Sequence, residues 1–164
     1  FGTQMISMGI SIFGLSPFGW RIMGAVFGIL MMPLMYLCAL HVFHKRRSAV
    51  FASLLLGIEF MHYTTSRIGT LEPFSVFFIF LMTTFMFKYI QTNLFETPLK
   101  KQFKLLALSG IFMGCACATK FTGVYGGIGL AVLFFMHLLD EIKEAMHNEH
   151  KKHLLPILIK TGCW

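Results

Sequence analysis

Residues 59–78 read EFMHYTTSRIGTLEPFSVFF and stand between two long apolar runs. The charged residues in this stretch are an acid, an arginine and a second acid: Glu59, Arg67 and Glu72. A charged side chain surrounded by hydrocarbon costs about 3 kcal/mol or more, unless it is paired or faces a polar cavity. The stretch therefore predicts a functional site within an apolar protein.

The composition predicts an all-α, polytopic membrane protein. Hydrophobic residues make up 56% of the chain and charged residues only 13%, against roughly 25% charged in an average soluble domain. The mean hydropathy is +0.72. The net charge of +7 does not indicate a nucleic-acid partner, because no basic face interleaved with exposed aromatic residues is found. Basic residues of membrane proteins usually collect in cytoplasmic loops, and the lipid bilayer is the expected partner.

Apolar runs of the length needed to cross a bilayer, about 20 residues, predict five full spans and the start of a sixth. They are expected at residues 17–43, 49–65, 72–89, 105–119 and 121–139, with the sixth beginning at Leu154. The chain starts at Phe1 and stops inside this last run, so we expect it to be an excerpt of a longer protein.

Three pairs of glycines with small-xxx-small spacing predict places where helix backbones approach one another. These pairs are Gly24/Gly28, Gly110/Gly114 and Gly123/Gly127.

The distribution of lysine and arginine predicts the orientation. Ten of these residues fall in the connections at 44–47, 88–104 and 140–153, which alternation of the spans places on one side of the membrane. This side is expected to be cytoplasmic. Arg21, Arg67 and Lys120 then lie on the outer side.

Glu59 and Glu72 are expected near the same depth as these three cations, which predicts a charged cavity at the outer face. Such a cavity suits a lipid-linked phosphate, because the planar fork of arginine binds phosphate oxygens in bidentate fashion. In the alternative interpretation, each cation is an interfacial anchor that snorkels to water, and this alternative stays open above all for Lys120. No metal site is expected, since the outer face shows no cluster of carboxylates or histidines.

Four segments in order resemble the protein O-mannosyltransferase family. Glu59, residues 65–67 and residues 71–72 resemble the family's E…T-x-S-R-x-x-L-(D/E) pattern, with three residues instead of two between Arg67 and Leu71. Residues 110–125 resemble its G-x-x-x-G…K-(W/F)-x-G-(L/V)-(F/Y) pattern. Residues 9–21 are similar to the end of the family's first outer loop and the start of its second helix, and residues 24–36 to the following helix. The compact connections look more like those of prokaryotic members.

The resemblance implies a GT-C-type transmembrane helical bundle, of which residues 1–164 are one part. It implies transfer of mannose from a polyprenyl- or dolichyl-phosphate carrier to Ser or Thr hydroxyls of proteins, on the extracytoplasmic side and without a cofactor. The membrane would be the plasma membrane in a prokaryote and that of the endoplasmic reticulum in a eukaryote.

The resemblance also implies roles for particular residues. The family's catalytic acid lies in an Asp-Glu pair of the first outer loop, before Phe1, so no catalytic residue is assigned and the excerpt alone is expected to be inactive. Arg21, Arg67 and Lys120 are the candidates for the carrier phosphate. Glu59 and Glu72 are the candidates for orienting these cations or the sugar, although the family often has Asp at the position of Glu72.

Two alternatives remain. A related transferase could use another lipid-phosphate sugar, such as aminoarabinose transferred to lipid A, with the same cationic outer face. A transporter or membrane scaffold is the non-enzymatic alternative. It is less favoured because transporters place polar breaks near the middle of discontinuous helices, whereas no span here is predicted to break at its middle.

Overall fold

The computed structural model describes residues 1–92 and 98–147, and these residues form helices and no strands. The helices are α1 Gly2–Phe13, α2 Pro17–Phe43, α3 Arg46–Ile58, α4 Phe60–Thr65, α5 Glu72–Ile90, α6 Leu99–Thr119 and α7 Gly123–His147. The expected all-α class is confirmed. The predicted sixth span, from Leu154, lies outside the described residues.

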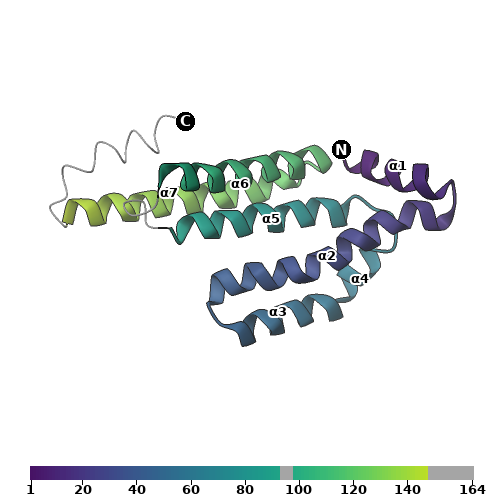
Figure 1. The fold of residues 1–164 in the computed structure, drawn as a ribbon, viewed down its shortest axis with the longest axis horizontal. Coiled ribbons are helices and arrows are strands. Elements are labelled where there is room, and N and C mark those ends of the chain that lie inside the picture. Colours follow the sequence, from purple (N-terminus) through teal and green to yellow (C-terminus); the bar gives the residue numbers. More distant parts are fainter. Residues whose placement is uncertain (93–97, 148–164) are drawn as a thin grey trace.

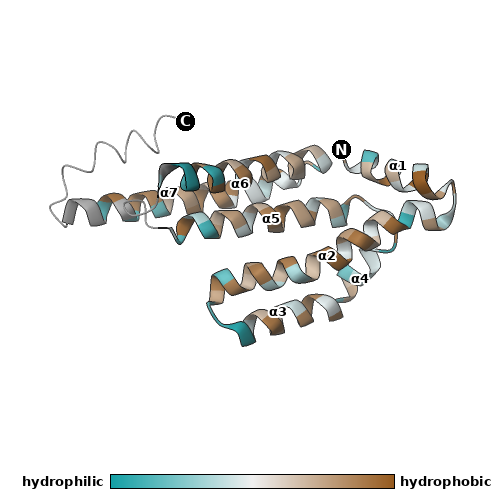
Figure 2. Ribbon diagram, in the orientation of Figure 1, coloured by the Kyte–Doolittle hydropathy of each residue, from teal (hydrophilic) through white to brown (hydrophobic). Residues whose placement is uncertain are grey.

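Helix α5 lies at the centre of the bundle and packs against α2, α6 and α7 (Figure 1). Helix α3 packs on the flank of α2, and α1 packs on α2 as well. Four helical segments are long and apolar enough to cross a membrane: Pro17–Phe43, Glu72–Ile90, Lys100–Thr119 and Gly123–Asp140. Hydrophilic residues gather at the starts of α3 and α6, which lie at the same end of the bundle (Figure 2).

The core forms where α5 meets its neighbours. Met82 is buried against Leu130 of α7, and the Ser109 hydroxyl of α6 donates a hydrogen bond to the Met82 carbonyl at 3.0 Å. On the other side of α5, the ring of Phe27 packs edge-on against Phe74, with centroids 4.8 Å apart. These contacts hold α2 and α6 on opposite sides of α5.

Helix α2 begins and ends where its local sequence predicts. The Ser16 hydroxyl accepts a hydrogen bond from the Gly19 N–H at 3.1 Å, and Pro17 occupies the first turn, where a missing N–H costs nothing. The helix ends at Phe43, and His44 follows in the left-handed conformation with φ 53°. The predicted helix at 17–43 is therefore confirmed.

The predicted single span at 49–65 is wrong, because Glu59 divides it into α3 and α4. The Glu59 backbone is extended, with φ −65° and ψ 119°. Its carboxylate accepts hydrogen bonds from the N–H groups of Met61 at 3.0 Å and His62 at 2.6 Å. A side chain that satisfies these N–H groups replaces the carbonyls of the preceding turn, so a new helix starts at Phe60. Helix α3, with 13 residues, is shorter than a typical span.

The other predicted helices are present, with longer bounds. The one expected at 72–89 runs from Glu72 to Ile90. The one expected at 105–119 begins at Leu99, inside the predicted polar connection. The one expected at 121–139 starts at Gly123 and continues to His147, through the charged residues after Leu139.

Two of the three glycine pairs make the predicted close contacts. A Cβ placed on Gly28 would lie 2.7 Å from the Cβ of Ser66, and one on Gly24 would lie 3.0 Å from the Ser66 carbonyl oxygen. The residue that ends α4 therefore packs directly on α2. Likewise, a Cβ on Gly123 would lie 2.7 Å from the Ala116 carbonyl carbon, so α7 starts against α6; Gly127 completes this pair, with Met113 of α6 2.9 Å away.

The prediction of a helix contact at Gly110 and Gly114 is wrong for the described part of the chain. Both residues are exposed, and no atom of the described residues lies within 4 Å of a Cβ placed at either, apart from their own helix backbone and chain neighbours. Helix α6 packs instead through the face that carries Ser109, Phe112 and Ala116.

Candidate functional site

The start of α2, the loop between α4 and α5, and the end of α6 meet at one end of the bundle (Figure 1). A Cβ on Gly2 would lie 2.8 Å from a Thr119 methyl carbon and 2.9 Å from a Leu71 methyl carbon. A Cβ on Gly69 would lie 3.2 Å from the Trp20 carbonyl oxygen. The structure thereby places Arg21, Arg67, Glu72 and Lys120, all next to these contact points, at this same end. This end of the bundle, called the site end below, lies opposite the end that carries the basic starts of α3 and α6.

Glu72 and Lys120 form an ion pair between the start of α5 and the residue that ends α6. The pair leaves 38% of the Lys120 side chain and 44% of the Glu72 side chain exposed. An exposed pair of this kind contributes no more than about 1 kcal/mol to stability. Its main effect is to fix where the Glu72 carboxylate points.

The Arg67 guanidinium lies over the ring of Tyr63, with its central carbon 4.0 Å from the ring centroid. A cation held over an aromatic face gains about 0.5–1 kcal/mol at an exposed site. Within residues 1–92 and 98–147, Arg67 forms no ion pair with Glu72. The exposed guanidinium is therefore held by Tyr63 on one face and remains available to an anion at its edge. Arg21 is also exposed.

Glu59 does not pair with a cation in the described part of the chain. Both of its carboxylate oxygens accept backbone N–H groups at the start of α4. Through these hydrogen bonds Glu59 sets the direction of α4 and of the loop that carries Arg67. Its expected role in orienting the cations or the sugar stays a prediction.

A cavity of about 370 Å³ lies between α2, α3, α4 and α5. Its polar lining residues are Glu59, His62, Thr65 and Glu72, and its apolar ones are Met31, Leu56, Met61, Pro73 and Val76. The cavity brings together the two acids that the sequence analysis singled out, which are 13 residues apart in the chain. No lysine or arginine of the described residues lines it, although Lys120 is paired with one of its walls.

His62, Thr65 and Tyr63 were not predicted from the sequence to belong to the site. A signal was present, because Glu59, His62 and Thr65 are spaced by three and residues with this spacing share one face of a helix. On a continuous helix at 49–65, a packing role is the expected one for His62, although it is close to Arg67 in the sequence. The break at Glu59 is what turns this short face toward the cavity.

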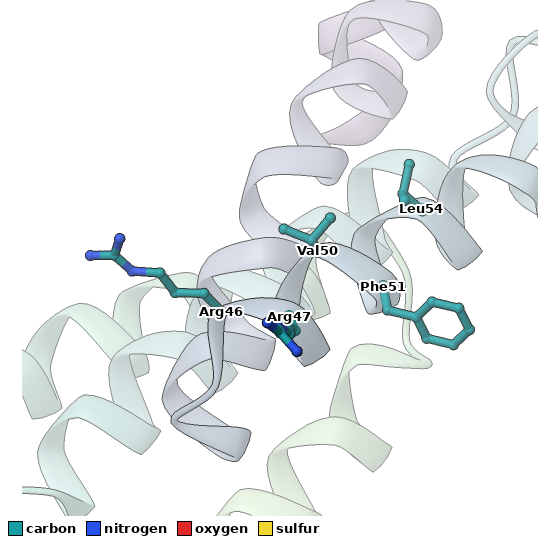
Figure 3. A pocket seen from close by; sticks show the side chains of 5 residues that line it. All are labelled: Arg46, Arg47, Val50, Phe51 and Leu54. Atoms are coloured by element: carbon teal, nitrogen blue, oxygen red, sulfur yellow. The ribbon is translucent and has the colours of Figure 1, made fainter.

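A second cavity, of about 360 Å³, lies along α3 at the opposite, basic end of the bundle (Figure 3). Its lining residues are Arg46, Arg47, Val50, Phe51 and Leu54. Figure 3 shows the Arg46 side chain reaching away from Val50, Phe51 and Leu54. A cation extending from an apolar face is typical of snorkelling at a membrane surface, so this cavity is not counted as part of the site.

Comparison with known proteins adds an independent line of argument. A family model described as dolichyl-phosphate-mannose-protein mannosyltransferase matches residues 3–159. The chain is 28% identical over 153 residues to a polyprenol-phosphate-mannose–protein mannosyltransferase of Mycobacterium tuberculosis, which covers 82% of the chain and 28% of the relative. No solved structure gives a significant match.

Two further relatives match at similar levels. An uncharacterized protein of Aquifex aeolicus is 29% identical over 161 residues, which covers 98% of the chain and 30% of that protein. Human protein O-mannosyl-transferase 1 is 28% identical over 124 residues, which covers 74% of the chain and 17% of that protein. The chain thus spans less than a third of the length of these relatives.

Proposed function

Because the chain belongs to the dolichyl-phosphate-mannose-protein mannosyltransferase family, we propose that it is part of an enzyme that transfers mannose from a polyprenyl- or dolichyl-phosphate carrier to Ser or Thr hydroxyls of proteins. The observation that carries this proposal is the gathering of cations and acids from α2, the α4–α5 loop, α5 and the end of α6 at one end of an apolar bundle. A lipid-linked phosphate sugar needs both an apolar surround for its chain and a charged site for its head.

In the proposed reaction, the bond between C1 of mannose and the phosphate oxygen breaks, and its electron pair leaves with the phosphate. The acceptor oxygen forms the new bond to C1 and loses its proton to a carboxylate base. The expected Asp-Glu pair before Phe1 would supply that base. Negative charge grows on the phosphate as it leaves, so preorganised cations accelerate the step.

We assign the phosphate to Arg67 and Arg21, and a positioning role to Lys120. Both arginines are exposed at the site end of the bundle, and their planar forks match phosphate oxygens. Lys120 is already paired with Glu72, so its charge acts on the donor through the placement of that carboxylate.

Replacement of Lys120 by methionine should lower transfer about tenfold and leave stability within about 1 kcal/mol of the parent, because the ion pair is half exposed. Glu72→Gln should have a similar effect. Since the two residues act as a unit, the double variant should retain as much transfer activity as the less active of the two single variants. The measurement is mannose transfer by the full-length enzyme beside its melting temperature. Losses that multiply in the double variant would show that Lys120 and Glu72 act separately.

We propose that the protein crosses the membrane several times, with the site end on the extracytoplasmic side. The support is the basic end formed by the starts of α3 and α6, which the positive-inside rule assigns to the cytoplasm. The plasma membrane is the proposed location in a prokaryote, and the endoplasmic reticulum membrane in a eukaryote.

Cysteine labelling in intact cells tests this orientation in a variant that lacks the native cysteines. A membrane-impermeant thiol reagent should label Ile68→Cys from outside, because Ile68 is 58% exposed at the site end. It should label Lys101→Cys only after permeabilisation. Gly69 is a poorer choice than Ile68, since its φ of 57° would strain a cysteine. Labelling of Lys101→Cys in intact cells would contradict the proposed orientation.

A transporter and a transferase with another sugar donor are the two alternatives to this function. No span was expected to break at its middle, but the predicted span at 49–65 is interrupted at Glu59, so helix continuity does not separate an enzyme from a transporter. Membership in the mannosyltransferase family favours the enzyme. An aminoarabinose-type donor would use the same cations. Assay of transfer from polyprenyl-phosphate-mannose, with mass spectrometry of the acceptor, tests the proposal, and transfer to lipid A instead of protein would contradict it.

A further inference from the structure

The cavity between α2, α3, α4 and α5 is lined by acids and by neutral residues, whereas Arg21 and Arg67 lie elsewhere at the same end of the bundle. We propose that this cavity is the subsite for the sugar ring of the donor, with His62 and Thr65 as sugar-binding residues, an inference that rests on the proposed function. The phosphate would lie outside it, toward Arg67.

The lining does not suit a phosphate. Two of the four polar lining residues are the carboxylates Glu59 and Glu72, and no lysine or arginine of the described residues lines the cavity. Carboxylates would repel a phosphate, but they accept hydrogen bonds from sugar hydroxyls. The apolar lining residues, such as Met31 and Val76, offer contact to the C–H groups of a ring. This mixture of apolar walls with a few placed polar groups is common in small-molecule sites.

The polar groups that line the cavity can also form further hydrogen bonds. Each Glu59 oxygen accepts one backbone N–H and keeps a further lone pair. The Thr65 hydroxyl donates to the Met61 carbonyl at 2.8 Å and can still accept. In the part of the chain that the structure describes, the His62 ring makes no hydrogen bond; the edge of the ring faces α2, where its Cε1 would lie 3.8 Å from a Cβ on Gly28. Such a set can receive several hydroxyls.

The charges that develop during the reaction also favour a sugar inside the cavity and a phosphate outside it. When the bond to the phosphate breaks, positive charge develops on the sugar ring, as in other glycosyl transfers with oxocarbenium-like transition states. Carboxylates next to the ring stabilise this charge, while the arginines stabilise the negative phosphate. Acids inside the cavity, together with cations at the same end of the bundle, fit both halves of the charge separation.

Helix α4 offers a matched pair of residues for a test. Thr64 and Thr65 are both half-buried, and each hydroxyl donates to the carbonyl four residues earlier, at 2.8 Å. Only Thr65 lines the cavity. Thr65→Val and Thr64→Val therefore remove the same group from the same helix, and a difference between them reports the cavity rather than the helix.

The experiment measures the affinity of the full-length enzyme in nanodiscs for two probes, polyprenyl phosphate and polyprenyl-phosphate-mannose. Thr65→Val and His62→Leu should weaken binding of the mannose probe about fivefold, as expected for one lost hydrogen bond, and leave polyprenyl phosphate unchanged. Thr64→Val should change neither. Arg67→Ala should weaken both probes to a similar extent.

Each other outcome has a distinct meaning. Equal weakening of both probes by Thr65→Val, or equal effects of Thr64→Val and Thr65→Val on the mannose probe, would overturn the sugar subsite and leave the proposed function standing. If the parent enzyme bound neither probe, the proposed function itself would fail, and the subsite with it.

Discussion

Arg67→Ala in the full-length enzyme is expected to lower mannose transfer on the order of a hundredfold, comparable to the loss of one preorganised donor in an active site. Negative charge builds on the phosphate as the sugar leaves, so a cation at this position helps most in the transition state. The exposed guanidinium needs no new conformation to bind the phosphate, because the ring of Tyr63 already holds one of its faces. Stability should change little, since Arg67 is on the surface.

Arg67→Lys should recover only part of the activity, because an ammonium group cannot reproduce the bidentate fork. Transfer from polyprenyl-phosphate-mannose should be measured for both variants, together with their melting temperatures. A stably folded Arg67→Ala enzyme with normal activity would remove Arg67 from the site.

The structure argues against a purely structural role in which Arg67 pairs with Glu72 to pin the loop. Glu72 pairs with Lys120 instead. The loop is fixed by the packing of Ser66 on Gly24 and Gly28. Glu72→Gln should therefore impair the enzyme by removing the carboxylate that Lys120 holds in place, and its effect should be independent of Arg67→Ala.

Much of the fold could be predicted from long apolar runs and from the residues that begin helices. The helices at 17–43 and 72–89 have long apolar runs and a proline in the first turn, so their type and start are well determined. The bounds of α6 and α7 were harder to predict, because both helices continue into charged residues. Lysines and glutamates are good helix formers, and the apolar pattern ends before the helix does.

The break at Glu59 could not be predicted from hydropathy, because it depends on a side chain competing for backbone N–H groups. The same carboxylate could have remained on the surface of a continuous helix. The site shows a similar division. The sequence singled out the charged residues, but their pairing depends on how the helices pack: Lys120 meets Glu72 across 48 residues, whereas Arg67, only five residues from Glu72, meets Tyr63.

Gly28→Leu is expected to destabilise the protein by about 1–3 kcal/mol, the usual range for overpacking a close contact. A Cβ at this position would lie 2.7 Å from the Ser66 Cβ, and that atom cannot move without moving the end of α4. Because Arg67 follows directly, the same variant should also weaken the binding of polyprenyl phosphate. The measurements are the melting temperature of the full-length enzyme in one fixed lipid mixture and its affinity for this probe.

Gly114→Leu is the matched control, because it places the same side chain in a long helix at a position with open space in the described residues. It should be nearly neutral, since leucine is also the better helix former by up to about 1 kcal/mol. If Gly114→Leu destabilised the protein as much as Gly28→Leu, the exposed face of α6 would have to be covered by residues outside the described part. If Gly28→Leu alone were neutral, Ser66 would not pack on α2 as the structure has it, and the geometry that places Arg67 would lose its support.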